Sequence, residues 1–219
     1  MKGKIRKNQV VIATLAVLIA IAGYISYDKK GIDWKTVAAA AGCSVRSMLV
    51  PDGVVVPESS GIKLFQPQVL PLLIMLNTAA IRLDKGDITK NKLIIFDRNG
   101  MLPDYLDRVV MSAARITVVT DCPEKYYPCL ADLMESHGVG VRVCSAPDPK
   151  MTYDVAVTWN ESANALLCLD AADLPMHNLI LPEEYVRMCP QGIDNFLFVC
   201  ALFECCGFAK AGDLTLRDV

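Results

Sequence analysis

Residues 92–121, KLIIFDRNGMLPDYLDRVVMSAARITVVTD, constrain the fold more than any other stretch of the chain. Residues 93–96 form a continuous apolar run, which is typical of a strand covered on both faces. Turn-forming residues follow at 97–100, and apolar positions at helical spacing then run from Leu102 to Ala113. A second run, ITVV, is rich in β-branched residues. The pattern predicts strand, helix and strand joined by a right-handed parallel crossover.

The same alternation continues along the chain. Residues 126–137 have helical spacing and end at Gly138, a residue type that commonly terminates helices. Further strands are expected at 139–144, 154–158 and 165–169, and further helices at 66–83, 182–189 and 194–206. The sequence therefore predicts an α/β fold, a Rossmann-like parallel sheet of about five strands with flanking helices. We expect the very apolar helix 194–206 to pack on this sheet beside helix 66–83.

Residues after the second expected strand resemble a known family. The stretch ITVVTDCPEKYYPCLADLMESHGVGVRV is similar to the second strand, helix and third strand of the NAD(P)-binding domain in shikimate-dehydrogenase-like enzymes. The resemblance covers about residues 92–170 and implies an NAD(P) cofactor. It places Asp121 where that family selects the ribose or its 2′-phosphate. It places Asn99 and Gly100 in the turn, FDRNGML, that corresponds to the family's glycine-rich loop.

The turn departs from the family pattern in two ways. Gly100 is its single glycine, whereas close approach of the backbone to a pyrophosphate uses several. Asp97 also adds a negative charge beside the expected phosphate position. Both candidate residues have structural alternatives, because Asn99 can cap the first crossover helix and Asp121 can cap the next. Two hypotheses follow: a non-catalytic Rossmann-like shell that binds a partner protein, or an NAD(P)-dependent oxidoreductase or a relic of one. No catalytic set can be assembled.

The N-terminus suggests membrane attachment. Residues 10–25 are apolar apart from Thr14, and four basic residues precede them. As a helix, residues 9–27 span about 28 Å, which is enough for the hydrocarbon core of a bilayer. The charge bias predicts one transmembrane helix with a cytoplasmic N-terminus and an extracytoplasmic domain. A signal peptide cleaved after residues 20–22 is the alternative.

This segment also carries a resemblance. KNQVVIATLAVLIAIAGYISY resembles the N-terminal membrane anchor of stage III sporulation protein AH over about the first 27 residues. The resemblance implies anchoring in the membrane and a role in sporulation. The expected organisation is a basic stub and anchor at 1–30, a linker at 31–61, the Rossmann-like domain at 62–209 and a tail at 210–219.

Charge and cysteine content exclude some classes of site. A net charge of −2 gives no indication of a nucleic-acid partner. The nine cysteines form no CxxC pair, and with only two histidines the chain has no zinc-ligand spacing. An odd, scattered set of cysteines also argues against a disulfide framework. We therefore expect no metal site and no nucleic-acid partner. The partners expected from the N-terminus and from the first hypothesis are the membrane and a protein.

Overall fold

The computed structural model describes residues 8–16, 19–27, 32–41 and 45–217 of the chain. The chain divides into two compact units, each built from two separate segments. One unit combines residues 1–67 with 181–211, and the other combines residues 68–180 with 212–219.

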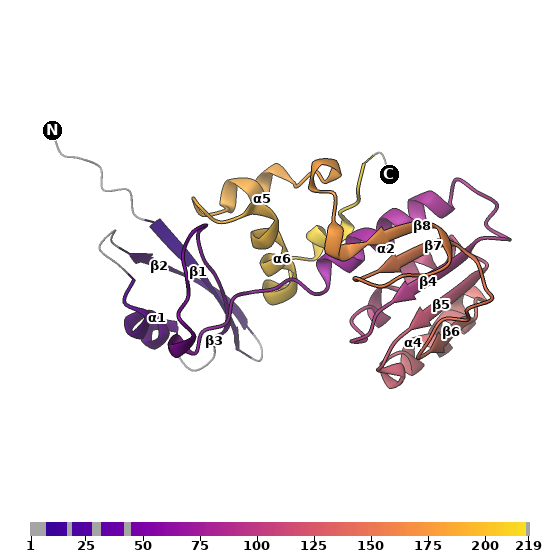
Figure 1. The fold of residues 1–219 in the computed structure, drawn as a ribbon, viewed down its shortest axis with the longest axis horizontal. Coiled ribbons are helices and arrows are strands. Elements are labelled where there is room, and N and C mark those ends of the chain that lie inside the picture. The colour runs from indigo at the N-terminus through magenta and orange to yellow at the C-terminus, as the bar shows by residue number, and fades with distance from the viewer. Residues whose placement is uncertain (1–7, 17–18, 28–31, 42–44, 218–219) are drawn as a thin grey trace. The chain divides into compact units, whose positions relative to one another are not determined.

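The second unit contains a parallel five-stranded sheet (Figure 1). Its strands are β4 (Lys92–Phe96), β5 (Arg115–Val119), β6 (Val141–Cys144), β7 (Tyr153–Thr158) and β8 (Ala165–Asp170). The spatial order is β6-β5-β4-β7-β8. In order of occurrence this is 3-2-1-4-5, the order of doubly wound dinucleotide-binding sheets. The prediction of a Rossmann-like α/β fold with about five strands is confirmed.

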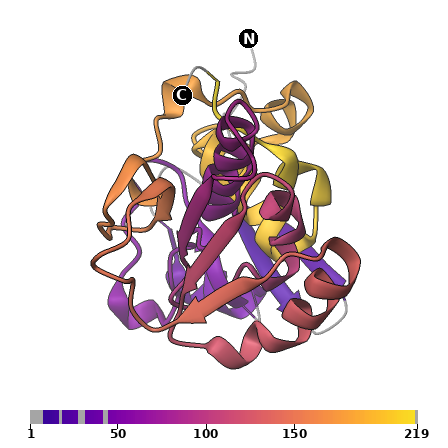
Figure 2. The same ribbon diagram turned by 90° about the vertical axis from the view of Figure 1, so that its right-hand side faces the viewer.

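Three helices accompany this sheet: α2 (Leu70–Leu83), α3 (Asp107–Val110) and α4 (Tyr127–His137) (Figures 1 and 2). α3 and α4 join consecutive strands that step in the same direction, so right-handed crossovers place both helices on one face. α2 packs against α3 and β7. The helix of the first crossover is shorter than expected, because residues Pro103–Tyr105 form a separate 3-10 helix before α3.

Two connections in the sheet contain no helix. Residues 145–152 join β6 to β7, and residues 159–164 join β7 to β8. The second connection is unusually short, because a parallel crossover ordinarily needs a dozen or more residues. The chain must therefore return along the sheet in a nearly extended form.

These two connections cover one apolar face of the sheet. The register pairs Ile94 with Ala156 and Phe96 with Val119, so the four side chains share a face. All four are buried, and the residues packed against their cluster include Met151 and Ala163, one from each connection. Loops therefore cover this face of the sheet, whereas helices cover both faces in a doubly wound fold.

The first unit has an antiparallel three-stranded sheet of order β2-β1-β3. Its elements are β1 (Asn8–Ala16), β2 (Ile19–Tyr27), α1 (Trp34–Ala41), β3 (Val45–Leu49), α5 (Glu183–Met188) and α6 (Asn195–Cys206). α6 contacts β1 and β2. The expectation that this helix packs on the parallel sheet beside α2 is wrong.

Short 3-10 turns occur in both units, at Glu58–Ser60, Pro123–Lys125, Ala171–Asp173, Met176–Asn178 and Ala209–Asp213.

The structure also corrects the expected N-terminal helix. β1 and β2 pair in register from Asn8 with Tyr27 to Ala16 with Ile19, where a membrane-spanning helix was predicted. Among the described residues no helix combines the length and apolarity needed to cross a bilayer. The physical reason is that an uninterrupted apolar run has no period that separates helix from strand. The stretch is also rich in Val, Ile, Thr and Tyr, which favour strands.

The last segment of the chain, which the sequence predicts as a tail, is held by the second unit. The Asn77 side-chain amide donates to the carbonyls of Gly212 (2.8 Å) and Leu214 (2.9 Å). The Leu216 N–H donates to the Thr78 hydroxyl at 3.1 Å. Leu214 and Leu216 are buried. These contacts make residues 212–217 part of the packed structure.

Candidate functional site

The carboxyl edge of the parallel sheet is the natural place to look for a site. Ligands of open α/β sheets bind there, at the point where the strand order reverses. In this sheet the reversal lies between β4 and β7. The turn after β4 begins with Asp97, Asp121 follows β5, and Glu161 follows β7.

Asp97 occupies the start of the first crossover with its own carboxylate. Its Oδ2 accepts hydrogen bonds from the backbone N–H groups of Met101 (2.6 Å) and Leu102 (2.8 Å), and from the hydroxyl of Tyr126. The residue is buried, with 1% of its surface exposed. Burial, and then the negative charge of Asp97, raise the pKa of the Tyr126 phenol. The tyrosine is therefore a neutral hydrogen-bond donor to this carboxylate.

At Gly100 the backbone comes close to other atoms, as the turn requires, but those atoms belong to the protein itself. Its φ is +60°, in the left-handed region that favours glycine. A Cβ here would lie 2.8 Å from Cδ of Lys125 and 3.2 Å from Cβ of Cys122, both in the segment after β5. The Lys125 ammonium also donates to the carbonyl of Asn99 at 2.7 Å. The space beside Gly100 is therefore filled by protein atoms.

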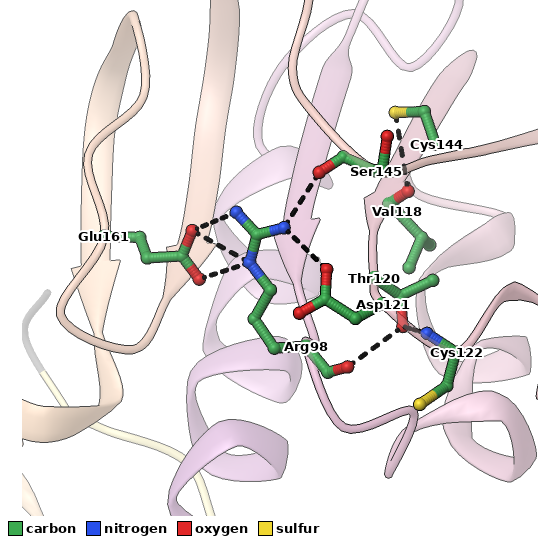
Figure 3. Close-up of polar contacts among 8 residues, drawn as sticks. All are labelled: Arg98, Val118, Thr120, Asp121, Cys122, Cys144, Ser145 and Glu161. Carbon is green, nitrogen blue, oxygen red and sulfur yellow. Dashed lines mark hydrogen bonds and ion pairs between the residues drawn. The ribbon is translucent and has the colours of Figure 1, made fainter.

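Arg98 connects four strand ends (Figure 3). Its Nε and Nη2 bind the carboxylate of Glu161, with a closest distance of 2.7 Å from Nη2 to Oε2. Nη1 donates to Oδ1 of Asp121 (3.2 Å) and to the carbonyl of Ser145 (2.8 Å). The guanidinium carbon lies 5.9 Å from the ring centre of Phe96. Glu161, the largest cause, and then Asp121 raise the pKa of Arg98 against the opposing effect of burial.

The structure brings the three candidate cofactor residues, Asn99, Gly100 and Asp121, to one edge of the sheet. Asn99 is exposed, and Asp97 rather than Asn99 accepts the N–H groups at the start of the crossover. Asp121 does not cap the next helix; it pairs with Arg98, and Cys122 stands at the N-cap position with its N–H bonded to Thr120.

Sequence reasoning missed the partners that define this edge. In the sequence, Tyr126 falls on the apolar face of the helix expected at 126–137. Nothing in that pattern indicates that its hydroxyl binds Asp97. Arg98 and Glu161 are 63 positions apart, and no local pattern pairs residues at that separation. The single available signal was their placement after two strands whose ends adjoin at the reversal point.

The Arg98 cluster carries more negative than positive charge. Within the Arg98 cluster one guanidinium faces the two carboxylates of Asp121 and Glu161, and Asp97 lies one residue away. Among the residues that the structure describes, no group of three or more metal-ligating side chains forms a metal site. The cysteines outside the undescribed segment 42–44 are free thiols, and burial raises the pKa of Cys189 and Cys205 to about 11.

Comparison with known proteins adds little to this geometry. No protein-family model and no curated protein matches the chain. Two solved structures of TarJ from S. aureus, one of them in complex with NADPH, are similar to it at 13% identity and a TM-score of 0.28. Each match covers 97% of this chain and 82% of the TarJ chain.

Proposed function

We propose that the parallel-sheet unit is a non-catalytic Rossmann-like domain that acts by binding a partner protein. The observation that carries this proposal is the position of the Asp97 carboxylate on the N–H groups of Met101 and Leu102. Those N–H groups lie at the strand-to-helix turn where a dinucleotide-binding domain receives a pyrophosphate. Here the chain supplies its own anion.

Energetics favour the closed turn over a bound dinucleotide. A phosphate in this position would have to displace a buried carboxylate and leave it without donors. Each buried polar group left unsatisfied costs about 1–3 kcal/mol, and more when it is charged. Asp121 and Glu161 would also repel the phosphates, while Arg98 is already engaged by both. The turn therefore offers a dinucleotide fewer free donors than a glycine-rich loop does.

Thermal unfolding with NADPH tests this proposal. A ligand present at 100 times its dissociation constant stabilises the folded state by about 2.7 kcal/mol. We expect the melting temperature of the full chain to stay unchanged in millimolar NADPH or NADH. A saturable rise with either cofactor would overturn the proposal, and an equal concentration of pyrophosphate separates cofactor binding from a general effect of anions.

Partner binding is supported by the outer strand of the sheet. β8 is an edge strand, and Leu166 on it is 80% exposed. Natural sheet edges are usually protected by charge or proline, and β8 contains no proline and one charged residue, Asp170 at its end. We expect a photocrosslinking amino acid at position 166 to form a defined adduct in cells. The exposed position 150 serves as the control. Equal labelling at the two positions would argue against a specific partner at β8.

An NAD(P)-dependent oxidoreductase is the second candidate. The strand order and the place of Asp121 after the second strand favour it, because an acidic residue there contacts the ribose in dinucleotide-binding domains. This candidate predicts that Asp97→Asn tightens binding by removing a charge that opposes the pyrophosphate. Titration calorimetry of both forms with NADPH distinguishes the candidates: uptake by either form supports the oxidoreductase, and no uptake supports the closed domain.

Membrane attachment and a role in sporulation remain proposals drawn from the sequence. They rest on the apolar residues 10–25 and the basic residues before them. We expect the full chain to stay with membranes in alkaline carbonate, and a chain that starts at residue 31 to be released. Recovery of the full chain in the carbonate supernatant would rule out an integral anchor.

A further inference from the structure

The two helix-free connections have one feature in common: both are bonded to the Arg98 guanidinium. Nη1 holds the carbonyl of Ser145, the first residue of connection 145–152. Nε and Nη2 hold the carboxylate of Glu161, in connection 159–164. One side chain from the end of β4 therefore bonds both segments that lie over the apolar face.

The apolar face beneath them depends on these connections for its cover. Met151 and Ala163 pack against the cluster that contains Ile94, Phe96 and Val119. The guanidinium itself lies over the Phe96 ring. Apart from the bonds to Arg98, few hydrogen bonds hold the connections: Met151 N–H donates to the Asp148 carbonyl within 145–152. At their far ends the Asn164 side-chain amide donates to the Thr152 hydroxyl at 3.0 Å and joins the two connections directly. Segments held by few long-range bonds open at low free-energy cost.

The Glu161 connection carries backbone strain. Asn160, directly before Glu161, has a φ of +56° in the left-handed region, which is uncommon for residues other than glycine. Its N–H donates to Oδ1 of Asp170 at 3.0 Å, and that oxygen also accepts the N–H of Ala172. The strained residue is thus fixed in the orientation that directs Glu161 toward Arg98. Strain of this kind persists where the surrounding structure over-determines it.

We propose that Arg98 is a latch that makes the two connections open and close together over the apolar face of the sheet. When the bidentate contact with Glu161 is lost, the guanidinium is no longer oriented toward Ser145, and both segments separate from the sheet. Opening exposes the strip of Ile94, Phe96, Val119 and Ala156. The device is independent of any cofactor, and it differs from partner binding at β8 proposed above.

Hydrogen exchange on the full chain tests the latch. We expect Glu161→Gln to speed amide exchange in residues 145–152 about tenfold, which corresponds to about 1.4 kcal/mol of opening free energy. Glu161 has no direct bond to that connection in the described structure. The Asn164–Thr152 bond joins the two connections without Arg98, so coupling through Arg98 is the effect that exceeds the one seen in a variant that disturbs only 159–164. Arg98→Gln should speed exchange in both connections, and exchange in α2 and α4 should stay as in the wild type, which shows that the fold is intact.

Asp170→Ala is the matched control. It removes the oxygen that accepts the Asn160 N–H, and so disturbs connection 159–164 without changing the bonds of Arg98. We expect its effect to stay mostly within 159–164. Oxidation of Met151 by dilute peroxide gives a second readout, and it should be faster in Glu161→Gln than in Asp170→Ala. Faster exchange confined to 159–164 in Glu161→Gln, or unchanged exchange in Arg98→Gln, would show that the connections move independently and overturn the latch.

Discussion

At the scale of single residues, Asp97 shows how a side chain can occupy a ligand's position. A short acidic residue at the end of a buried strand reaches the backbone N–H groups of its own turn, and Tyr126 donates to the same carboxylate oxygen, Oδ2. The carboxylate is therefore a structural group whose removal leaves donors unsatisfied. Its neighbour Asn99, which the sequence pattern favours as the cap, is exposed.

The first prediction compares these two neighbours. Asp97→Ala leaves the Leu102 N–H and the Tyr126 hydroxyl without their acceptor, at about 1–3 kcal/mol for each buried group. We expect a loss of about 3 kcal/mol or more in the free energy of unfolding, measured by urea denaturation. Asn99→Ala should change it by less than about 0.5 kcal/mol. A larger loss for Asn99→Ala than for Asp97→Ala would restore Asn99 as the cap.

The second prediction compares two glycines with positive φ. Gly100→Ala strains the backbone and drives the added Cβ against Lys125 and Cys122. At Gly138 (φ +67°) an added Cβ would meet no neighbouring group within 4 Å. Both substitutions lose roughly 1–2 kcal/mol from the left-handed backbone. Gly100→Ala should lose about 1 kcal/mol more through overpacking. Equal losses in thermal unfolding would mean that the turn after β4 is not crowded.

At the scale of elements, the sequence predicted what depends on local pattern. β4 and β5 coincide with their apolar and β-branched runs to within one residue, and α4 ends at Gly138 with φ +67° as expected. The predictions of the anchor helix and of the packing of α6 were wrong for the same reason. Both are apolar without clear periodicity, so neither the type of element nor its packing partner is encoded locally. The Arg98 cluster joins segments far apart in sequence and was equally beyond local reasoning.

The third prediction tests the first crossover element. Val109 in α3 is fully buried, and Met111, two positions later, is 62% exposed. Val109→Asp buries a carboxylate without a partner and should cost several kcal/mol, about 3 or more. Met111→Asp places the same charge in solvent and should be nearly neutral. Circular dichroism during thermal unfolding measures both. Similar melting temperatures for the two variants would mean that the buried face of α3 is assigned incorrectly.

At the scale of the whole molecule, the chain passes twice through each unit. The parallel-sheet unit is completed by residues 212–219, and the other unit by residues 181–211. The last segment is bonded to α2 through Asn77 and Thr78, both buried. Stability of the parallel-sheet unit therefore includes residues at the far end of the chain.

The fourth prediction is that the end of the chain stabilises α2. Removal of residues 214–219 leaves Asn77 with one of its two carbonyl acceptors and removes buried Leu214 and Leu216. We expect faster hydrogen exchange in α2 and a loss of about 2–4 kcal/mol from apolar burial. Removal of residues 218–219 alone is the control and should change neither. Unchanged exchange in α2 after the longer truncation would contradict the assignment of this segment.

The alternation of segments along the chain has a consequence for biosynthesis. Domains of a nascent protein generally fold as units, N-terminal first, while the ribosome still adds residues. Here the two units are interleaved, because residues 181–211 of the first unit are translated after residues 68–180 of the second. The apolar strands β4 to β8 emerge before residues 212–217, which belong to their unit, are translated. While residues 68–180 are translated, the nascent chain therefore carries two unfinished units at once.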